Sequence, residues 1–188
     1  MSGAVDPVDT AGVSGASDAA GPSDEELAAR VIAALVASGR RLAVAESLTG
    51  GLLTAALVGV PGASRALTGG IVSYDTALKR TLLGVESSIL AVHGAVHPDV
   101  ARQMARGVRQ TCEVDGRPAD VGVSTTGAAG PDPQDGQAPG TAFVGLSLDG
   151  DSRAIPLHLD GDRQQVRAGV VHEALRALAE ALGSGGNI

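Results

Sequence analysis

Short apolar runs alternate along this chain with longer segments of helical periodicity, and this alternation limits the fold more than any other feature. The first helical segment has an apolar residue at every fourth position from Leu27 to Leu35, begins after a capping-box residue, Ser23, and stops at Gly39. A buried strand, "RLAVAE" at 41–46, follows. Further strands are predicted at 69–74, 119–127, 141–150 and 151–159, and further helices within 49–64, 75–84, 85–96, 97–114 and 162–182.

Helices that alternate with short apolar strands predict a layered α/β domain. The turn residues at 149–151 join the last two strands as a hairpin, which makes the sheet mixed rather than purely parallel. We therefore expect a single three-layer α/β/α domain over residues 24–183. The first 23 residues consist largely of Gly, Ser, Ala, Asp and Pro and predict a disordered tail, and residues 184–188 predict a frayed end.

The composition argues against several kinds of partner. Aromatic residues make up only 1% of the chain, so no stacking platform for single-stranded nucleic acid is expected, and the net charge of −7 disfavours nucleic acid and anionic membranes. No apolar run reaches the roughly 18 residues of a membrane span, and the N-terminal residues lack the pattern of a signal peptide. The single cysteine, Cys112, fits a reducing cytoplasm, where we expect the protein to act.

The stretch "AESLTGG" places hydroxyl residues and glycines at a predicted strand end. In an α/β sheet, ligands bind at the carboxyl ends of the strands, so Ser47 is expected to present its hydroxyl there. A helix N-terminus behind it offers free N–H groups to an oxyanion or a phosphate, and Gly50 and Gly51 let a ligand approach the backbone. The alternative is that Ser47 or Thr49 only caps the helix.

Three further segments hold candidate site residues. Tyr74 ends a predicted strand, and Lys79 follows five residues later in a helical stretch, where the alternative is an ordinary solvated lysine. Thr126 and Gly127 end another strand and enter a long Gly/Pro loop, which is either functional or a plain connector. Arg163, at the start of the last helix, is suited to binding a phosphate through two hydrogen bonds, unless it lies on a solvated face.

The sequence predicts neither a metal site nor a bound cofactor. The histidines do not occur at metal-ligand spacings, and the single cysteine adds no ligand cluster; they are His93, His97, His158 and His172. A Walker A phosphate loop is absent from the sequence as well.

These motifs occur in one order: "AESLTGG", "GGIVSYDTALK", "TTGAAGPD", "PGTAFVGL" and "GDRQQVR". Together they resemble the C-terminal domain family of the competence/damage-inducible protein CinA, over roughly residues 26–182. Family members are nicotinamide-nucleotide amidases, which deamidate nicotinamide mononucleotide to nicotinate mononucleotide and ammonia. Larger members carry an additional N-terminal domain. Only the tail precedes the match here, so the resemblance implies a stand-alone amidase with a small-molecule nucleotide as its substrate.

The resemblance also implies residue roles. Ser47 and Lys79 match the family's nucleophile and base, and Tyr74 is expected to orient one of them by hydrogen bonding. Thr49, Gly50, Gly51, Thr126 and Gly127 are candidates for substrate contacts, and Arg163 for the substrate phosphate. The alternative functions are a nucleotide-binding or regulatory protein that has lost turnover and an amidase for a different carboxamide.

Three positions depart from the pattern that is common in relatives. Leu48 replaces a cysteine, Thr76 an asparagine and His97 a serine. The loop after "GPD" is also Pro-rich here rather than Gly-rich. The change at Leu48 is not expected to affect the reaction, whereas the departures at His97 and in this loop bear on substrate preference. The Ala-rich helices and the family's frequent association also predict a homo-oligomer, a dimer or larger.

Overall fold

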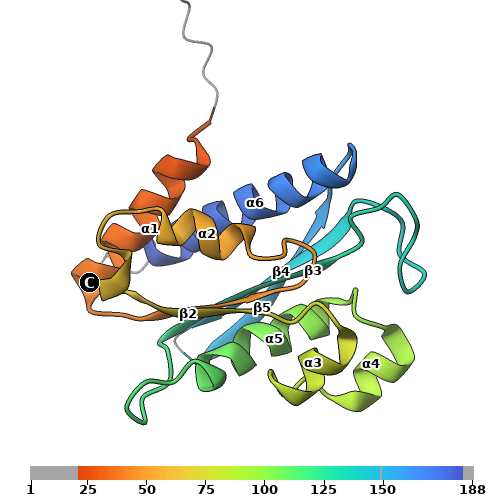
Figure 1. Cartoon of the computed structure of the whole chain (residues 1–188), viewed down its shortest axis with the longest axis horizontal. Helices are drawn as coiled ribbons and strands as arrows, with labels where there is room; N and C mark the ends of the chain where they lie inside the picture. The colour runs from red at the N-terminus through yellow and green to blue at the C-terminus, as the bar shows by residue number, and fades with distance from the viewer. Residues whose placement is uncertain (1–20, 149, 184–188) are drawn as a thin grey trace, which may run out of the picture.

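A computed structural model describes residues 21–148 and 150–183 of this chain (Figure 1). The first twenty residues of the predicted tail and the predicted frayed end at 184–188 lie outside this range. Within it the structure is an α/β fold, as the sequence predicts.

One mixed sheet of five strands, in the order β2-β1-β3-β4-β5, forms the centre of the fold. The first three in space are parallel, and the hairpin of the last two strands adds antiparallel pairing, as expected from its turn residues. The strands are β1 (Leu42–Glu46), β2 (Leu67–Val72), β3 (Val121–Gly127), β4 (Thr141–Leu148) and β5 (Asp151–His158).

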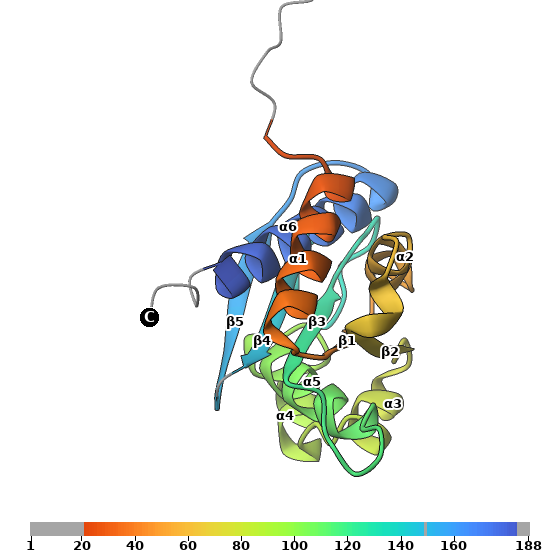
Figure 2. The same ribbon diagram turned by 90° about the vertical axis from the view of Figure 1, so that its left-hand side faces the viewer.

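Helices cover both faces of the sheet (Figures 1 and 2). The helices on one face are α1 (Asp24–Ser38), α2 (Leu52–Val58) and α6 (Arg163–Gly183), and those on the other are α3 (Thr76–Thr81), α4 (Ser87–His93) and α5 (Pro98–Thr111). A short 3₁₀ helix, η1 (Ala63–Arg65), precedes β2. The three layers of the predicted architecture are therefore present.

Local sequence signals explain where the helices begin and end. The side chains of Ser23 and Glu26 form a reciprocal capping box at the start of α1, and Gly39 ends this helix in the left-handed conformation. His97 caps α5, and Pro98 occupies its first turn, where a missing N–H costs nothing. The second predicted strand is displaced by two residues: it begins at Leu67 and ends at Val72, so Tyr74 lies beyond it.

The core consists of aliphatic side chains packed on the two faces of the sheet. A larger cluster joins α1, α2 and α6 to the sheet, and a smaller cluster lies under α5. β1 and β3 are buried along their whole length, as expected for strands covered on both faces. Among the described residues, no helix is long and apolar enough to cross a membrane.

Candidate active site

The parallel strands end together at one edge of the sheet. Glu46, the last residue of β1, is in register with Val72 of β2 on one side and with Thr125 of β3 on the other. The crossover from β1 to β2 runs through α2 on one face, and that from β2 to β3 runs through α3, α4 and α5 on the other face. This reversal is a topological switch point, the place where open α/β sheets bind their ligands.

Glu46 is fully buried, and its carboxylate closes the N-terminus of α2. It accepts hydrogen bonds from the backbone N–H groups of Gly51 (2.9 Å), Leu53 (3.1 Å) and Thr54 (2.8 Å), and from the Thr54 hydroxyl (2.6 Å). The expectation of free N–H groups at this helix start is therefore wrong, because an internal carboxylate uses them. The sequence signal for this capping role was Glu46 itself, a carboxylate that ends a predicted strand and precedes a predicted helix.

Ser47 lies just beyond β1 and is buried. Its N–H donates to the Thr125 carbonyl (3.0 Å), which continues the pairing of β1 with β3 by one residue. Its hydroxyl has no hydrogen-bond partner among the described residues. The capping role considered for Ser47 is not seen, since Gly51 is the N-cap residue of α2 and Glu46 takes the helix amides.

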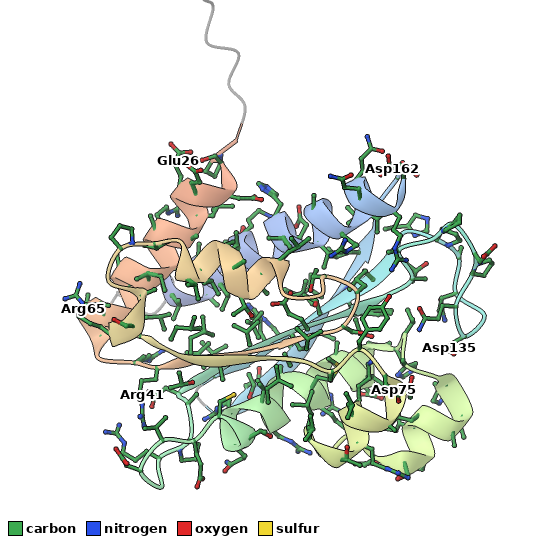
Figure 3. The ribbon with its side chains drawn as sticks, viewed as in Figure 1. Glu26, Arg41, Arg65, Asp75, Asp135 and Asp162 are labelled. Carbon is green, nitrogen blue, oxygen red and sulfur yellow. The ribbon has the colours of Figure 1, made fainter. Side chains whose placement is uncertain are left out.

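Lys79 is buried in α3, with only 1% of its surface exposed, so the alternative of a solvated lysine is wrong. Its Nζ donates to the carbonyls of Ser73 (2.7 Å) and Tyr74 (3.3 Å). Burial lowers its pKa to about 8, against the opposing attraction of Asp75 and Asp135. Figure 3 shows these carboxylates at the start of α3 and in the loop between β3 and β4. An amine with this pKa is partly neutral near physiological pH.

Lys79 is also the only lysine of the 188 residues, and every other side chain with a permanent positive charge is an arginine. A guanidinium stays protonated in proteins, whereas a buried ammonium changes its pKa readily. The single lysine of the chain therefore lies at a buried position beside the sheet edge. This signal was present in the sequence, but the spacing analysis did not use it.

The structure brings Lys79 and Ser47 to the same strand ends without a hydrogen bond between them. Lys79 bonds the Ser73 carbonyl, and the Ser73 N–H donates to the Glu46 carbonyl (2.8 Å), one residue before Ser47. Backbone contacts of β2 with β1 thus tie the two predicted catalytic residues together.

A hydrogen-bonded bridge joins Tyr74 to α6. Arg163 donates to the Tyr74 hydroxyl (2.9 Å) and to the Gly130 carbonyl (2.9 Å). The Tyr74 side chain is 59% exposed. Its hydroxyl therefore contacts Arg163 rather than Ser47 or Lys79, which corrects the expected orienting contact; only its backbone carbonyl touches Lys79.

A small cavity of about 60 Å³ lies beside Ser47. Four predicted site residues line it, Ser47, Tyr74, Gly127 and Arg163, and they are joined by Leu48, Ala129 and Gln134. Gln134 was not among the candidates. Its place in the long Gly/Pro loop was the available signal.

The other predicted substrate contacts lie outside this lining and have protein partners. The buried Thr49 hydroxyl bonds that of Thr125 (2.7 Å), and the Thr126 hydroxyl donates to the Ala95 carbonyl (2.7 Å). The N–H of Gly51 is bonded by Glu46, and a Cβ on Gly50 would lie 3.3 Å from the guanidinium of Arg167. The space at these glycines is therefore filled by the protein itself.

Among residues 21–148 and 150–183, no group of three or more His, Cys, Asp or Glu side chains is placed to hold a metal ion. The cavity residues carry hydroxyl, amide and guanidinium groups, which suit a polar organic ligand rather than a metal.

The sequence model of the CinA C-terminal domain matches residues 24–182, almost all of the described chain. The chain belongs to the CinA C-terminal domain family. A CinA-like protein from Anaeromyxobacter sp. (strain Fw109-5) is 44% identical over 163 residues, which cover 86% of this chain and 38% of the relative. A CinA-like protein from Frankia casuarinae is 44% identical over 155 residues, which cover 82% and 35%. The chain thus spans less than half the length of these relatives.

Solved CinA structures share the fold. The competence damage-inducible protein A (ComA) from Klebsiella pneumoniae is 35% identical, with a TM-score of 0.80, over 86% of this chain and 98% of that one. A competence-damaged protein (CinA) superfamily protein from Enterobacter cloacae is 29% identical, with a TM-score of 0.82, over 92% and 99%. This chain therefore aligns with almost the whole length of these two solved chains.

Proposed function

We propose that this protein is a nicotinamide-nucleotide amidase. It hydrolyses the carboxamide of nicotinamide mononucleotide to nicotinate mononucleotide and ammonia, with Ser47 as nucleophile and Lys79 as base. The observation that carries the proposal is the burial of the only lysine of the chain, with its pKa lowered to about 8, at the strand ends where Ser47 lies. Membership of the CinA family supports the reaction class.

The reaction needs a nucleophile, a base and a stabiliser of the oxyanion. Ser47 Oγ attacks the carboxamide carbon, and neutral Lys79 accepts the hydroxyl proton. The tetrahedral intermediate then collapses, the C–N bond breaks, and Lys79 returns its proton to the departing ammonia. A water molecule then attacks the acyl carbon, Lys79 again accepts the proton, and the acyl group is released from Ser47 as the carboxylate. The proton transfer requires Ser47 and Lys79 to approach each other, and such contacts commonly tighten only when the substrate is bound.

Arg163 is the proposed phosphate ligand. It lines the cavity of Ser47, and its exposed guanidinium donates only to a hydroxyl and a backbone carbonyl in the described structure. The 60 Å³ cavity is far smaller than the roughly 300 Å³ or more of ordinary small-molecule sites. We therefore expect the bridge from Arg163 to Tyr74 to open when a nucleotide enters, which frees the guanidinium for the phosphate.

The proposed setting is the cytoplasm, with a small nucleotide as substrate and no nucleic acid or membrane as partner. The acidic charge balance, with a net charge of −7, supports this choice, and so does the single cysteine.

The test is ammonia release from nicotinamide mononucleotide by the wild type and by Ser47→Ala, Lys79→Met and the double variant. Residues that act as one unit lose about as much singly as together, so all three variants are expected to be equally inactive. Lys79→Arg is also expected to fail, because arginine stays protonated. Arg80→Met is the matched control, since it removes an exposed cation from the same helix. Near wild-type rates in Ser47→Ala would exclude Ser47 as the nucleophile.

A further inference from the structure

A second arginine of α6, Arg167, contacts the turn that carries Ser47. Its Nε donates to the Leu48 carbonyl (2.8 Å), and its Nη2 donates to the Thr49 carbonyl (2.9 Å). One guanidinium thus bonds two successive carbonyls directly after the proposed nucleophile. A planar guanidinium has this fixed fork of donors, whereas an ammonium does not.

The arginine fixes the direction of the peptide groups in this turn. In a trans peptide, the carbonyl and the N–H of the next residue point in opposite directions. Because the Leu48 carbonyl points toward Arg167, the Thr49 N–H points away from Arg167. Among the described residues, the N–H groups of Leu48 and Thr49 have no hydrogen-bond partner, although both residues are buried. Buried backbone N–H groups are rarely left unpaired, because their desolvation is costly.

Two further observations connect this turn to the cavity. Leu48 lines the cavity together with Ser47, while its side chain belongs to the core cluster between α1, α2 and α6. Gly50 has a φ of +60°, and an added Cβ would approach Nη2 of Arg167 to 3.3 Å. Glycine at this position therefore leaves room for the guanidinium.

We propose that Arg167 is a positioning residue for the amidase reaction, and that it holds the Thr49 N–H group as an oxyanion donor. This inference rests on the proposed function. Donors held in place before the reaction stabilise the developing negative charge without reorganisation, and loss of such a donor commonly lowers kcat by about 100-fold or more. Arg167 touches neither substrate nor reacting atoms; it acts through the backbone of the turn.

The test compares Arg167→Ala, Arg167→Lys and the matched control Arg176→Ala. Arg176 lies on the same helix but pairs with Glu173 and Glu180 on the surface. We expect Arg167→Ala to lower kcat for nicotinamide mononucleotide by about 100-fold, with less than about a threefold change in KM. Added guanidinium ion, at a concentration too low to unfold the protein, is expected to restore part of the rate. Arg167→Lys is expected to remain impaired and Arg176→Ala to retain full activity.

Unchanged kcat in Arg167→Ala overturns the proposal. So does a loss of rate that follows a lowered melting temperature and that guanidinium does not rescue, because this pattern indicates a structural role alone.

A second measurement separates this inference from the proposed function. If the wild type releases no ammonia, the amidase proposal fails, and the reaction of Ser47 with a fluorophosphonate is then measured. In that reaction the Oγ–P bond forms, fluoride leaves, and the hydroxyl proton passes to the base, without any need for the correct substrate. Slower labelling in Arg167→Ala than in the wild type and Arg176→Ala supports the positioning role. Equal labelling, or no labelling of the wild type, contradicts it.

Discussion

At the scale of single residues, the proposed site depends on Lys79, because the surroundings of this side chain set its pKa. Lys79 has an ordinary pKa of 10.5 in water, but burial in α3 lowers it to about 8. The two carboxylates that attract the ammonium, Asp75 and Asp135, oppose this change without cancelling it. A lysine with this pKa is partly neutral in neutral or mildly alkaline solution, which is what the proposed role as a base requires.

The first prediction is a pKa of about 8 for Lys79, measured directly. Because the chain has one lysine, protein labelled with ¹³C at lysine Cε gives a single side-chain lysine signal, which can be followed from pH 6 to pH 11 by NMR. The base must be neutral, so kcat/KM is expected to rise as the pH increases through about 8 and to level off above it. A titration midpoint near 10.5 would contradict the proposed base.

At the scale of secondary-structure elements, the short helix α2 is held by a residue outside it. A seven-residue helix has little stability of its own, and its first N–H groups need partners. The buried carboxylate of Glu46 accepts three of these amides and one hydroxyl. This arrangement also fixes the end of β1, and with it the position of Ser47.

The second prediction is that Glu46→Gln destabilises the fold. A glutamine amide has a single acceptor oxygen and no charge, so some of the buried amides lose their partner. We expect the free energy of unfolding to fall by about 2 kcal/mol in urea denaturation. Glu113→Gln, at an exposed position after α5, is the control and is expected to leave stability within about 0.5 kcal/mol of the wild type. Equal stability of the two variants would show that the cap contributes little.

The third prediction concerns the bridge between α6 and the segment after β2. Arg163→Ala is expected to raise KM for nicotinamide mononucleotide far more than for the unphosphorylated riboside, because only the nucleotide loses a charge-assisted contact. Tyr74 is the only tyrosine, and the chain has no tryptophan, so tyrosine emission reports the opening of the bridge directly. Equal KM effects on the two substrates would remove Arg163 from phosphate binding.

At the scale of the whole molecule, the outer edge of β2 is exposed. No strand of the described residues pairs with this edge, and the strand sequence "LTGGIV" has neither charge nor proline. Leu52, Val58 and Val72 expose large apolar side chains on α2 and β2, and a groove of about 650 Å³ runs between α2, η1 and β2. Proteins usually protect such edges, and pairing with another chain is one way to do so.

The fourth prediction is that the protein is a dimer or larger in solution, with the β2 edges of two copies in contact. Light scattering is expected to give at least twice the mass of one chain. Val58→Glu is expected to lower this mass, because it places a charge on the exposed apolar surface, whereas Val92→Glu, on the exposed face of α4, is the control. A monomer in the wild type would contradict the prediction.

The sequence alone determined the order of the elements, the mixed sheet and the hairpin. These features follow from local patterns: the capping box of Ser23 and Glu26, the stop at Gly39, and apolar runs of strand length. Local signals of this kind act within a few residues, so they can be read from the chain without knowing its neighbours in space. The same holds for the presence of Ser47 at a strand end.

Only the tertiary structure decided which of the candidate site residues are buried, which are exposed, and which already have hydrogen-bond partners in the protein. Lys79 has the spacing of a solvated helix residue, but the packing of α3 against the strand ends buries it. The glycines after Ser47 suggested room for a ligand, but Arg167, more than a hundred residues later, fills the space beside Gly50. The burial of a side chain and its hydrogen-bond partners depend on segments far apart in the sequence. Burial and hydrogen bonding in turn set the pKa of a lysine and decide whether a backbone N–H group is free. For this reason the site chemistry follows from packing, while the fold follows largely from local pattern.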